Sequence, residues 1–137
     1  MSSENIGIAR RAVEAWNRRD AEAIVELCDP DIEYVNPPQA VEPGTRRGHE
    51  GLARVLRDQW GFLVDGARIE IERIHERDDD VYTLARIEGK MPGSDASIAV
   101  RGLFLWRVRA GKLVRIEGIA TGGTEVQEAL ERVGLSD

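Results

Sequence analysis

The first half of the chain carries apolar residues at helical spacing. Four of them recur at steps of three and four residues with charged residues between them, namely Ile6, Ala9, Val13 and Trp16. This spacing predicts an amphipathic helix over residues 4–18. Asp20 is placed to cap a second, short helix over residues 21–27. A strand is predicted over residues 32–35, and a third helix from His49 to Leu63 after a proline-containing loop.

From residue 68 onward the period changes to two. Apolar and polar residues alternate over four segments, which predicts four antiparallel strands at residues 68–72, 81–88, 97–109 and 113–121. The segment Thr124-Glu125-Val126-Gln127 has the pattern of a capping box, so a final helix is expected to begin there and to close at Gly134. This order predicts an α+β domain whose sheet is covered by the helices of the first half.

Length and charge narrow the class of protein. The 137 residues, 42% of them hydrophobic, suit one domain spanning 1–137 with a core of its own. The net charge of −6 argues against a nucleic-acid surface. No apolar run approaches the roughly 20 residues of a membrane helix, and the first residues lack the apolar stretch of a signal peptide. We therefore expect a cytoplasmic protein without nucleic-acid or membrane partners.

Five stretches of the chain, taken in order, resemble the SnoaL-like polyketide cyclase family within the nuclear transport factor 2-like superfamily. They are residues 15–20 (AWNRRD), 31–37 (DIEYVNP), 48–52 (GHEGL), 110–115 (AGKLVR) and 128–135 (EALERVGL). The resemblance implies a cone-shaped, curved antiparallel sheet wrapped around the N-terminal helices, an internal apolar pocket, a short C-terminal helix and homodimers. That superfamily includes isomerases, cyclases, dehydratases, epoxide hydrolases and non-enzymatic binders, so the fold alone does not give the function.

In such a cone, the inward face of the sheet lines the pocket. Alternation places one set of side chains of the third long strand inward, namely Val100, Gly102, Phe104, Trp106 and Val108. The same rule turns inward Ile69, Ile71, Val81, Thr83, Ala85, Ile87, Ile116, Gly118 and Ala120. Trp16 and Trp60 are expected at the mouth of the cone. This lining is almost free of polar groups, so it predicts either a lipophilic ligand or a plain core.

The main polar candidates are Tyr34 and Asn36, which lie two residues apart and so share one face of a strand. By resemblance to ketosteroid isomerases, Asn36 occupies the position of an Asp general base, but an amide cannot take up that proton. By resemblance to limonene epoxide hydrolases, the pair holds a water molecule, although Gly118 stands where one Asp of those enzymes is expected. Arg86 and Glu88 resemble their Arg-x-acid element, yet alternation points both outward unless a bulge intervenes. The alternative is a turn-stabilising Asn and a core Tyr.

Histidine and cysteine offer little further chemistry. His49, at the start of the third helix, is a candidate for proton transfer or for capping backbone groups. His75 is expected near an exposed hairpin end, too far away to form a histidine pair with His49. Cys28 is expected to be a small buried hydrophobe. Two histidines and one cysteine make a metal site improbable, and the glycines of residues 44–51 lack a phosphate-binding motif. We expect neither a metal nor a cofactor.

The outer face of the sheet mixes acidic and basic residues around Leu84, Leu103 and Leu105. We expect opposite charges to pair across neighbouring strands and this face to form a homodimer interface. The leading functional hypothesis is a small-molecule protein that binds a lipophilic ligand and acts on it by acid–base chemistry of the isomerase, cyclase, dehydratase or epoxide-hydrolase kind. The alternatives are a non-catalytic binding or dimerisation module and an accessory protein that acts through a partner.

Overall fold

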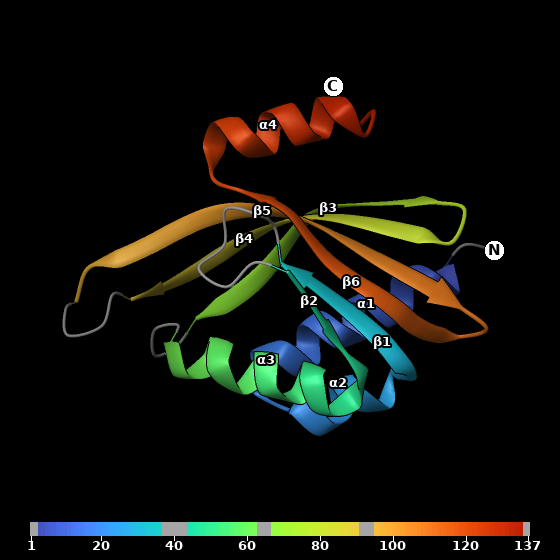
Figure 1. Cartoon of the computed structure of the whole chain (residues 1–137). Coiled ribbons are helices and arrows are strands. Elements are labelled where there is room, and N and C mark those ends of the chain that lie inside the picture. The colour runs from blue at the N-terminus through green and yellow to red at the C-terminus, as the bar shows by residue number, and fades with distance from the viewer. Residues whose placement is uncertain (1–2, 37–43, 63–66, 91–94, 136–137) are drawn as a thin grey trace.

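The fold is one curved sheet with helices on both of its sides (Figure 1). It is seen in a computed structural model, which describes residues 3–36, 44–62, 67–90 and 95–135. The elements in chain order are α1 (Ser3–Asn17), α2 (Ala21–Glu26), β1 (Cys28–Asn36), β2 (Gly44–Arg47), α3 (Gly48–Phe62), β3 (Arg68–Arg77), β4 (Asp80–Lys90), β5 (Ser97–Arg109), β6 (Lys112–Thr121) and α4 (Gly123–Arg132). The predicted α+β class, with N-terminal helices and a short C-terminal helix, is confirmed. Leu63 and the prolines at 37, 38 and 43 lie outside the described residues.

The sheet has six strands in the order β2-β1-β6-β5-β4-β3. Its four long strands form the predicted antiparallel order β3-β4-β5-β6, and β1 joins β6 in parallel. The edge strand β2 pairs with β1 in antiparallel orientation. The edge strand β2 was not predicted, because Gly44-Thr-Arg-Arg47 has no apolar residue that would give an alternating pattern. Pairing with β1 alone holds this short segment in extended form.

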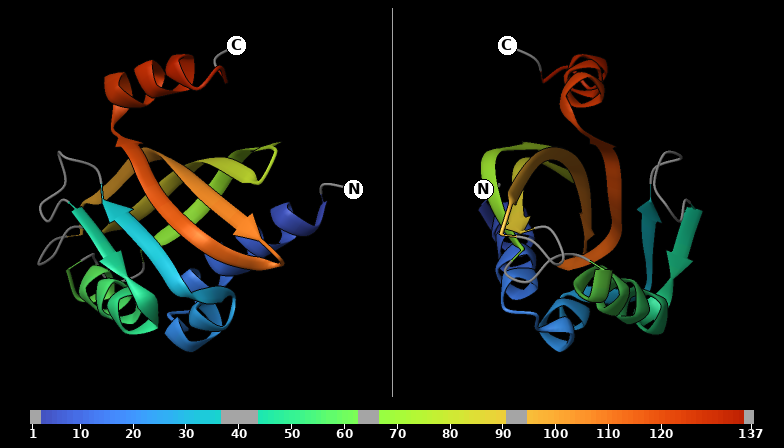
Figure 2. Two further views of the ribbon diagram at one scale, coloured as in Figure 1. Left: turned by 45° about the vertical axis from the view of Figure 1, so that its right-hand side comes forward. Right: turned by 90° about the vertical axis from the view of Figure 1, so that its left-hand side faces the viewer.

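The curved sheet packs on two sides. Figure 2 shows α1, α2 and α3 on the concave side and α4 beyond the convex side. The larger apolar cluster, between the concave face and the first three helices, includes Ala9, Trp16, Ile32, Leu52, Trp106 and Ile116. A smaller cluster lies under α4 and contains Leu84, Leu103, Ala120, Val126, Ala129, Leu130 and Leu135. Leu84 and Leu103, expected on an open outer face, are therefore covered by the apolar side of α4.

Local sequence predicted the N-terminal cap of α2 correctly but not that of α4. Asp20 caps α2 as predicted, because its Oδ1 accepts a hydrogen bond from Ala23 N at 3.0 Å. The capping box at α4 does not form in the expected way. Gly122, at φ 90°, is the N-cap, and Thr124 lies inside the first turn of the helix. A glycine tolerates this left-handed backbone, which turns the chain sharply from β6 into α4.

Alternation holds along β5 because its pairing with β4 is unbroken from Asp80–Arg107 to Lys90–Ser97. Phe104 and Trp106 therefore face the helices, while Arg101 and Arg107 face outward, as predicted. Arg86 and Glu88 form an ion pair of 2.6 Å on the outer face of β4. The unbroken register of β4 with β5 contains no bulge that would turn them inward.

Register shifts elsewhere reverse the alternation, and two of them change faces that the sequence predicted. In β3 the shift between Ile71 and Arg73 turns Ile74 inward, where strict alternation would have placed Arg73. In β6 the pairs Phe104–Gly118 and Leu103–Ala120 leave Ile119 as the extra residue. Ala120 is consequently packed beneath α4 rather than in the concave face, contrary to expectation.

Candidate functional site

The register aligns concave side chains in rows that run across the sheet. Tyr34 of β1 pairs with Ile116 of β6, which pairs with Trp106 of β5. All three are buried in the larger cluster. The indole Nε1 of Trp106 donates to Thr83 Oγ1 at 2.9 Å, so its polar atom has a partner inside the protein. This row forms packed core beneath the three N-terminal helices.

The next row contains Asn36, Gly118 and Phe104. Phe104 pairs with Gly118, and continuation of the parallel β1–β6 register places Asn36 beside that glycine. A Cβ built on Gly102 would lie 2.7 Å from Cε2 of Phe104, which shows that the phenyl ring folds back over Gly102. The ring is only partly buried. Asn36 and Phe104 therefore mark the boundary between the packed core and the rest of the concave face.

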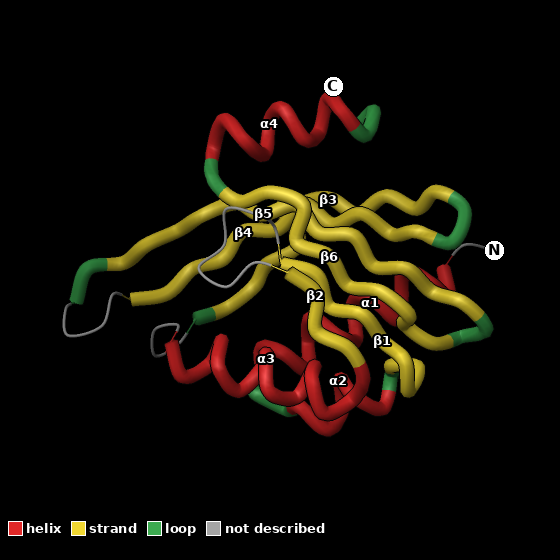
Figure 3. The backbone as a smooth tube through the Cα atoms, viewed as in Figure 1, coloured by secondary structure: helices red, strands yellow, loops and turns green. Residues whose placement is uncertain are grey.

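Beyond this boundary lies the open end of the sheet, where β4 ends and β5 begins. Figure 3 shows these strands extending past the last described turn of α3. Ile69, Ile87 and Val100 pair side by side in one row of the concave face. Val100 and Ile98, the next concave residue of β5, are each 38% exposed. We call this set, Ile69, Ile87, Ile98 and Val100, the apolar wall.

An aromatic cluster lies on the helical side of the same end. The rings of Trp16 (α1) and Trp60 (α3) have centroids 6.2 Å apart, and the guanidinium carbon of Arg19 lies 4.8 Å and 5.9 Å from them. Arg19 also donates through Nη2 to Ala67 O at 2.8 Å. Its positive φ of 61° directs the chain out of α1 into this position. We call Trp16, Arg19 and Trp60 the tryptophan cluster.

Asn17 joins the tryptophan cluster to the apolar wall. Its side-chain amide donates to Ile69 O at 2.9 Å and accepts from Ile69 N at 2.8 Å. The amide thus occupies the hydrogen-bonding positions that a neighbouring strand would use at the edge of β3. Since Ile69 belongs to the apolar wall, this pair of bonds fixes the end of α1 against the first row of the open end.

His49 lies apart from Tyr34 and Asn36. Its Nε2 is 3.0 Å from the carbonyl oxygen of Cys28, so the ring donates to backbone at the start of β1. Cys28 pairs with Leu113, at the end of the sheet opposite the apolar wall. Of the three predicted catalytic residues, only Tyr34 and Asn36 lie on the same face of the sheet, in neighbouring rows. The bond to Cys28 gives His49 a backbone-capping position.

The environment of Cys28 favours the protonated thiol near neutral pH. Burial raises the pKa of its thiol to about 12, against a smaller opposing effect of Lys112. Its Sγ also donates to Ile24 O at 3.2 Å. A nucleophile or metal ligand requires the thiolate, which this environment disfavours.

Among the described residues, two buried side-chain polar atoms make no hydrogen bond: Nε1 of Trp60 and Oε1 of Glu76. The sequence pattern placed Trp60 at the mouth of the cone only as an aromatic surface, and it gave Glu76 no role. Strict alternation from Ile69 and Ile71 would turn Glu76 outward. The register shift before Arg73 turns Glu76 to the concave face instead. No local pattern in the sequence predicts that shift.

The convex face carries paired charges, as expected. Glu33 bonds with Arg47 at 3.0 Å and with Arg115 at 3.2 Å, and Arg107 bonds with Asp80 at 2.7 Å. These pairs join neighbouring strands and leave the face polar where α4 does not cover it.

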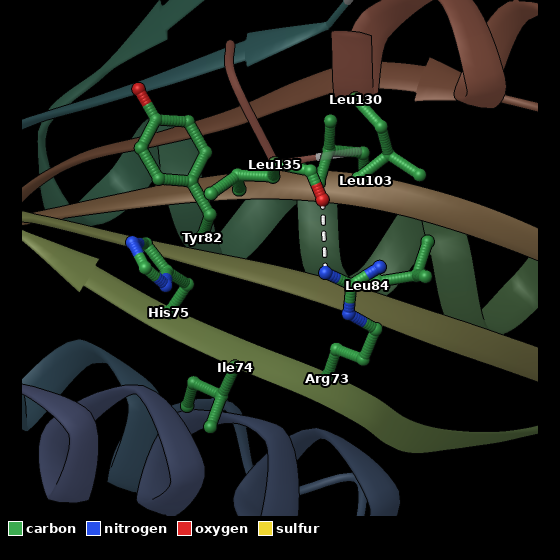
Figure 4. Close-up of a pocket in the computed structure, with 8 residues that line it drawn as sticks. All are labelled: Arg73, Ile74, His75, Tyr82, Leu84, Leu103, Leu130 and Leu135. Carbon is green, nitrogen blue, oxygen red and sulfur yellow. Dashed lines mark hydrogen bonds between the residues drawn. The ribbon is translucent and has the colours of Figure 1, made fainter. Parts of the chain in front are cut away.

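A small crevice of about 60 Å³ lies on the convex side, between β3, β4, β5 and α4. Figure 4 shows the residues that line it. Arg73 crosses it to donate to Leu135 O at 2.9 Å, while the adjacent Ile74 points to the opposite side of the sheet. Exposed His75 and the ring of Tyr82 lie at its rim. The crevice is far smaller than a small-molecule pocket, and the bond from Arg73 to Leu135 fixes the end of the chain after α4 against it.

Among residues 3–36, 44–62, 67–90 and 95–135, no group of three His, Cys, Asp or Glu side chains is arranged to hold a metal ion. In the same part of the chain, no helix is long and apolar enough to cross a membrane.

Solved structures share this fold over nearly the whole chain. A nuclear transport factor 2-like protein from Burkholderia thailandensis is 26% identical, with a TM-score of 0.74 over 92% of this chain and 96% of that one. TerC, co-crystallised with polyporic acid, is 24% identical, with a TM-score of 0.73 over 94% and 98%. A hypothetical protein of ketosteroid isomerase-like fold from Catenulispora acidiphila, in complex with trimethylamine, is 20% identical, with a TM-score of 0.72 over 94% and 93%.

Sequence comparison gives the family. No curated protein matches the chain. The model of the SnoaL-like domain matches residues 9–116, which include most of α1 and most of the sheet. The matched segment covers the tryptophan cluster, the apolar wall and the row of Asn36 and Phe104. The chain therefore belongs to the SnoaL-like domain family.

Proposed function

We propose that this protein binds a small lipophilic molecule between the apolar wall and the tryptophan cluster. The observation that carries the proposal is the exposure of Val100 and Ile98 on the concave face, at 38% each. The apolar side chains of the convex face at Leu84 and Leu103 are buried under α4 instead. Contiguous exposed apolar surface on a concave face is characteristic of ligand sites.

The polar groups that β1 contributes beside this surface, Tyr34 and Asn36, are neutral. Asn36 lies at the inner edge of the site, and the phenol of Tyr34 is one row deeper in the core. Phenol and amide can orient a carbonyl, hydroxyl or epoxide oxygen without ionising at pH 7. In this part of the chain, the concave residues of β5 from Ile98 to Phe104 and their pairing partners in β4, from Thr83 to Gly89, include no acidic residue and no histidine. This composition favours binding and polarisation over abstraction of a proton by a strong base.

Non-catalytic binding is the second candidate, and one observation favours it. The imidazole of His49 bonds to Cys28 O at the other end of β1, so it does not lie beside Asn36. Among the described concave residues of β4 and β5 next to Asn36, turnover would rest on neutral groups. The co-crystal of TerC with polyporic acid supports the choice of that compound as a first probe.

The test uses two substitutions of adjacent residues on opposite faces of β5. Val100→Asn places an amide in the apolar wall, and Ala99→Asn places the same group on the convex side; both positions are exposed, so neither should unfold the protein. We expect Val100→Asn to weaken binding of polyporic acid at least tenfold and Ala99→Asn to leave it unchanged. Equal affinity in both variants would refute the site.

Tyr34→Phe and Asn36→Ala separate a ligand role from a structural one. A group that orients a ligand oxygen should lower affinity or turnover when removed, on the order of 100-fold for an oxyanion-type donor. A structural group should lower only the melting temperature. Unchanged binding in both variants, with lower melting temperatures, would assign Tyr34 and Asn36 to the core and the β1–β2 connection.

A further inference from the structure

The indole of Trp60 differs from that of Trp106 in its polar atom. Both rings belong to the larger apolar cluster, and both Nε1 atoms are shielded from solvent. Trp106 donates to Thr83 Oγ1 at 2.9 Å, whereas Nε1 of Trp60 has no hydrogen-bond partner. Buried donors are almost always paired in folded proteins, so an unpaired one calls for an explanation such as a bound molecule.

The position of Trp60 connects this donor with the proposed ligand site. Its ring lies 6.2 Å from that of Trp16, and Arg19 ties the cluster to Ala67, just before β3. Asn17, next to Trp16, pairs with Ile69 of the apolar wall. The Trp60 ring that carries this donor therefore lies on the helical side of the open end, where Ile98 and Val100 of the apolar wall are exposed.

We infer that the N–H of Trp60 donates a hydrogen bond to an oxygen of the lipophilic ligand. This inference rests on the proposed function and specifies its ligand class: an apolar ring system that carries a carbonyl, hydroxyl or carboxylate oxygen, in preference to a hydrocarbon. Arg19 strengthens the preference, because its guanidinium carbon lies 5.9 Å from the Trp60 ring and its positive charge favours an electron-rich oxygen.

A ligand oxygen should bind this donor favourably because the folded protein has already removed water from the N–H of Trp60. A donor in water must give up a water hydrogen bond before it binds a ligand, which reduces the net gain. The N–H of Trp60 has no such bond to lose. A ligand with a matching oxygen should therefore bind about tenfold more tightly than the same skeleton without it, corresponding to about 1.4 kcal/mol.

The first experiment pairs two ligands with two proteins. Fluorene and fluorenone share one ring skeleton, and only fluorenone has a carbonyl oxygen. Equilibrium dialysis measures the affinity of each for the wild type and for Trp60→Phe, which keeps an aromatic ring and removes the N–H. We expect fluorenone to bind the wild type about tenfold more tightly than fluorene, and this difference to disappear in Trp60→Phe.

A second measurement needs no variant that could lose stability. The indole N–H of Trp60 in ¹⁵N-labelled wild-type protein should shift downfield when fluorenone is added and move little with fluorene. Trp106, already bonded to Thr83, is the internal reference and should not show this difference. Trp60→Phe serves to assign the signal.

The outcomes separate the two proposals. If neither compound nor polyporic acid binds, the proposed lipophilic site itself is wrong. If fluorene and fluorenone bind the wild type equally, or if the Trp60 signal responds equally to both, the site stands and the role of Trp60 is overturned. A fluorenone preference that persists in Trp60→Phe also overturns it, since another group must then supply the bond.

Discussion

Replacing Gly102 with alanine tests the packing at the boundary of the proposed site. Gly102 has no positive φ, so alanine is compatible with its backbone. Its new Cβ, however, would lie 2.7 Å from Cε2 and 3.0 Å from Cζ of Phe104, closer than side chains pack. Thr121 Cγ2, at 3.6 Å, is in ordinary contact. The Phe104 ring must therefore turn away from the strand.

The size of the effect follows from two opposing terms. Displacing the ring costs about 1–3 kcal/mol through overpacking and strained rotamers. Alanine in a strand recovers about 0.5–1 kcal/mol relative to glycine, because it restricts the unfolded chain. We expect Gly102→Ala to lower the free energy of unfolding by about 1 kcal/mol in the wild-type background. In the Phe104→Ala background, where the ring is absent, the same change should stabilise by about 0.5 kcal/mol.

The assay is a double-mutant cycle by urea denaturation, with the wild type, both single variants and the double variant. The predicted coupling between positions 102 and 104 is about 1.5 kcal/mol, which exceeds the usual deviation from additivity. If Gly102→Ala has the same effect in both backgrounds, the ring does not lie over Gly102, and the boundary of the site is wrongly placed.

Three further predictions concern the ends of the molecule and its assembly. Asn17→Asp cannot donate to Ile69 O, so it should lower the free energy of unfolding by about 1–3 kcal/mol in a denaturant titration; an unchanged value would dismiss the strand-like pairing. Because the folded pKa of Cys28 is about 12 and the ordinary value 9.0, the folded state retains a proton that the unfolded state releases. Stability should therefore be fully present below about pH 9 and fall by up to about 1.4 kcal/mol per pH unit between pH 9 and 12. Cys28→Ala should fall less over the same range, and identical curves would show that the thiol does not cause the loss. We also expect a homodimer through the part of the convex face that α4 leaves uncovered, and light scattering that gives a monomer at micromolar concentration would contradict it.

Local pattern determined the elements and most of their faces. The helical spacing from Ile6 to Trp16 gave α1, and Asp20 gave the start of α2, because both depend on residues within one or two turns. The alternation of β5 gave the inward Phe104 and Trp106. It could do so because the β4–β5 pairing runs without a register shift, so a period of two survives along its whole length.

Tertiary structure decided where the period breaks and which polar groups meet. The shifts in β3 and β6 moved Ile74 and Glu76 inward and Ala120 outward; such shifts depend on how whole strands fit their neighbours, not on a local preference. The short β2 likewise exists only because β1 offers it a partner.

The candidate site shows the same division. The sequence proposed Tyr34 and Asn36 together because two residues on one strand share a face, and it grouped His49 with them on chemistry alone. The fold separated His49 through its bond to Cys28, 21 residues away, and joined Asn17 to Ile69 across 52 residues. It also left Trp60 Nε1 without a partner while Trp106 found Thr83. Partners so distant in the chain are brought together by the curvature of the sheet around the helices, which no window of local sequence encodes.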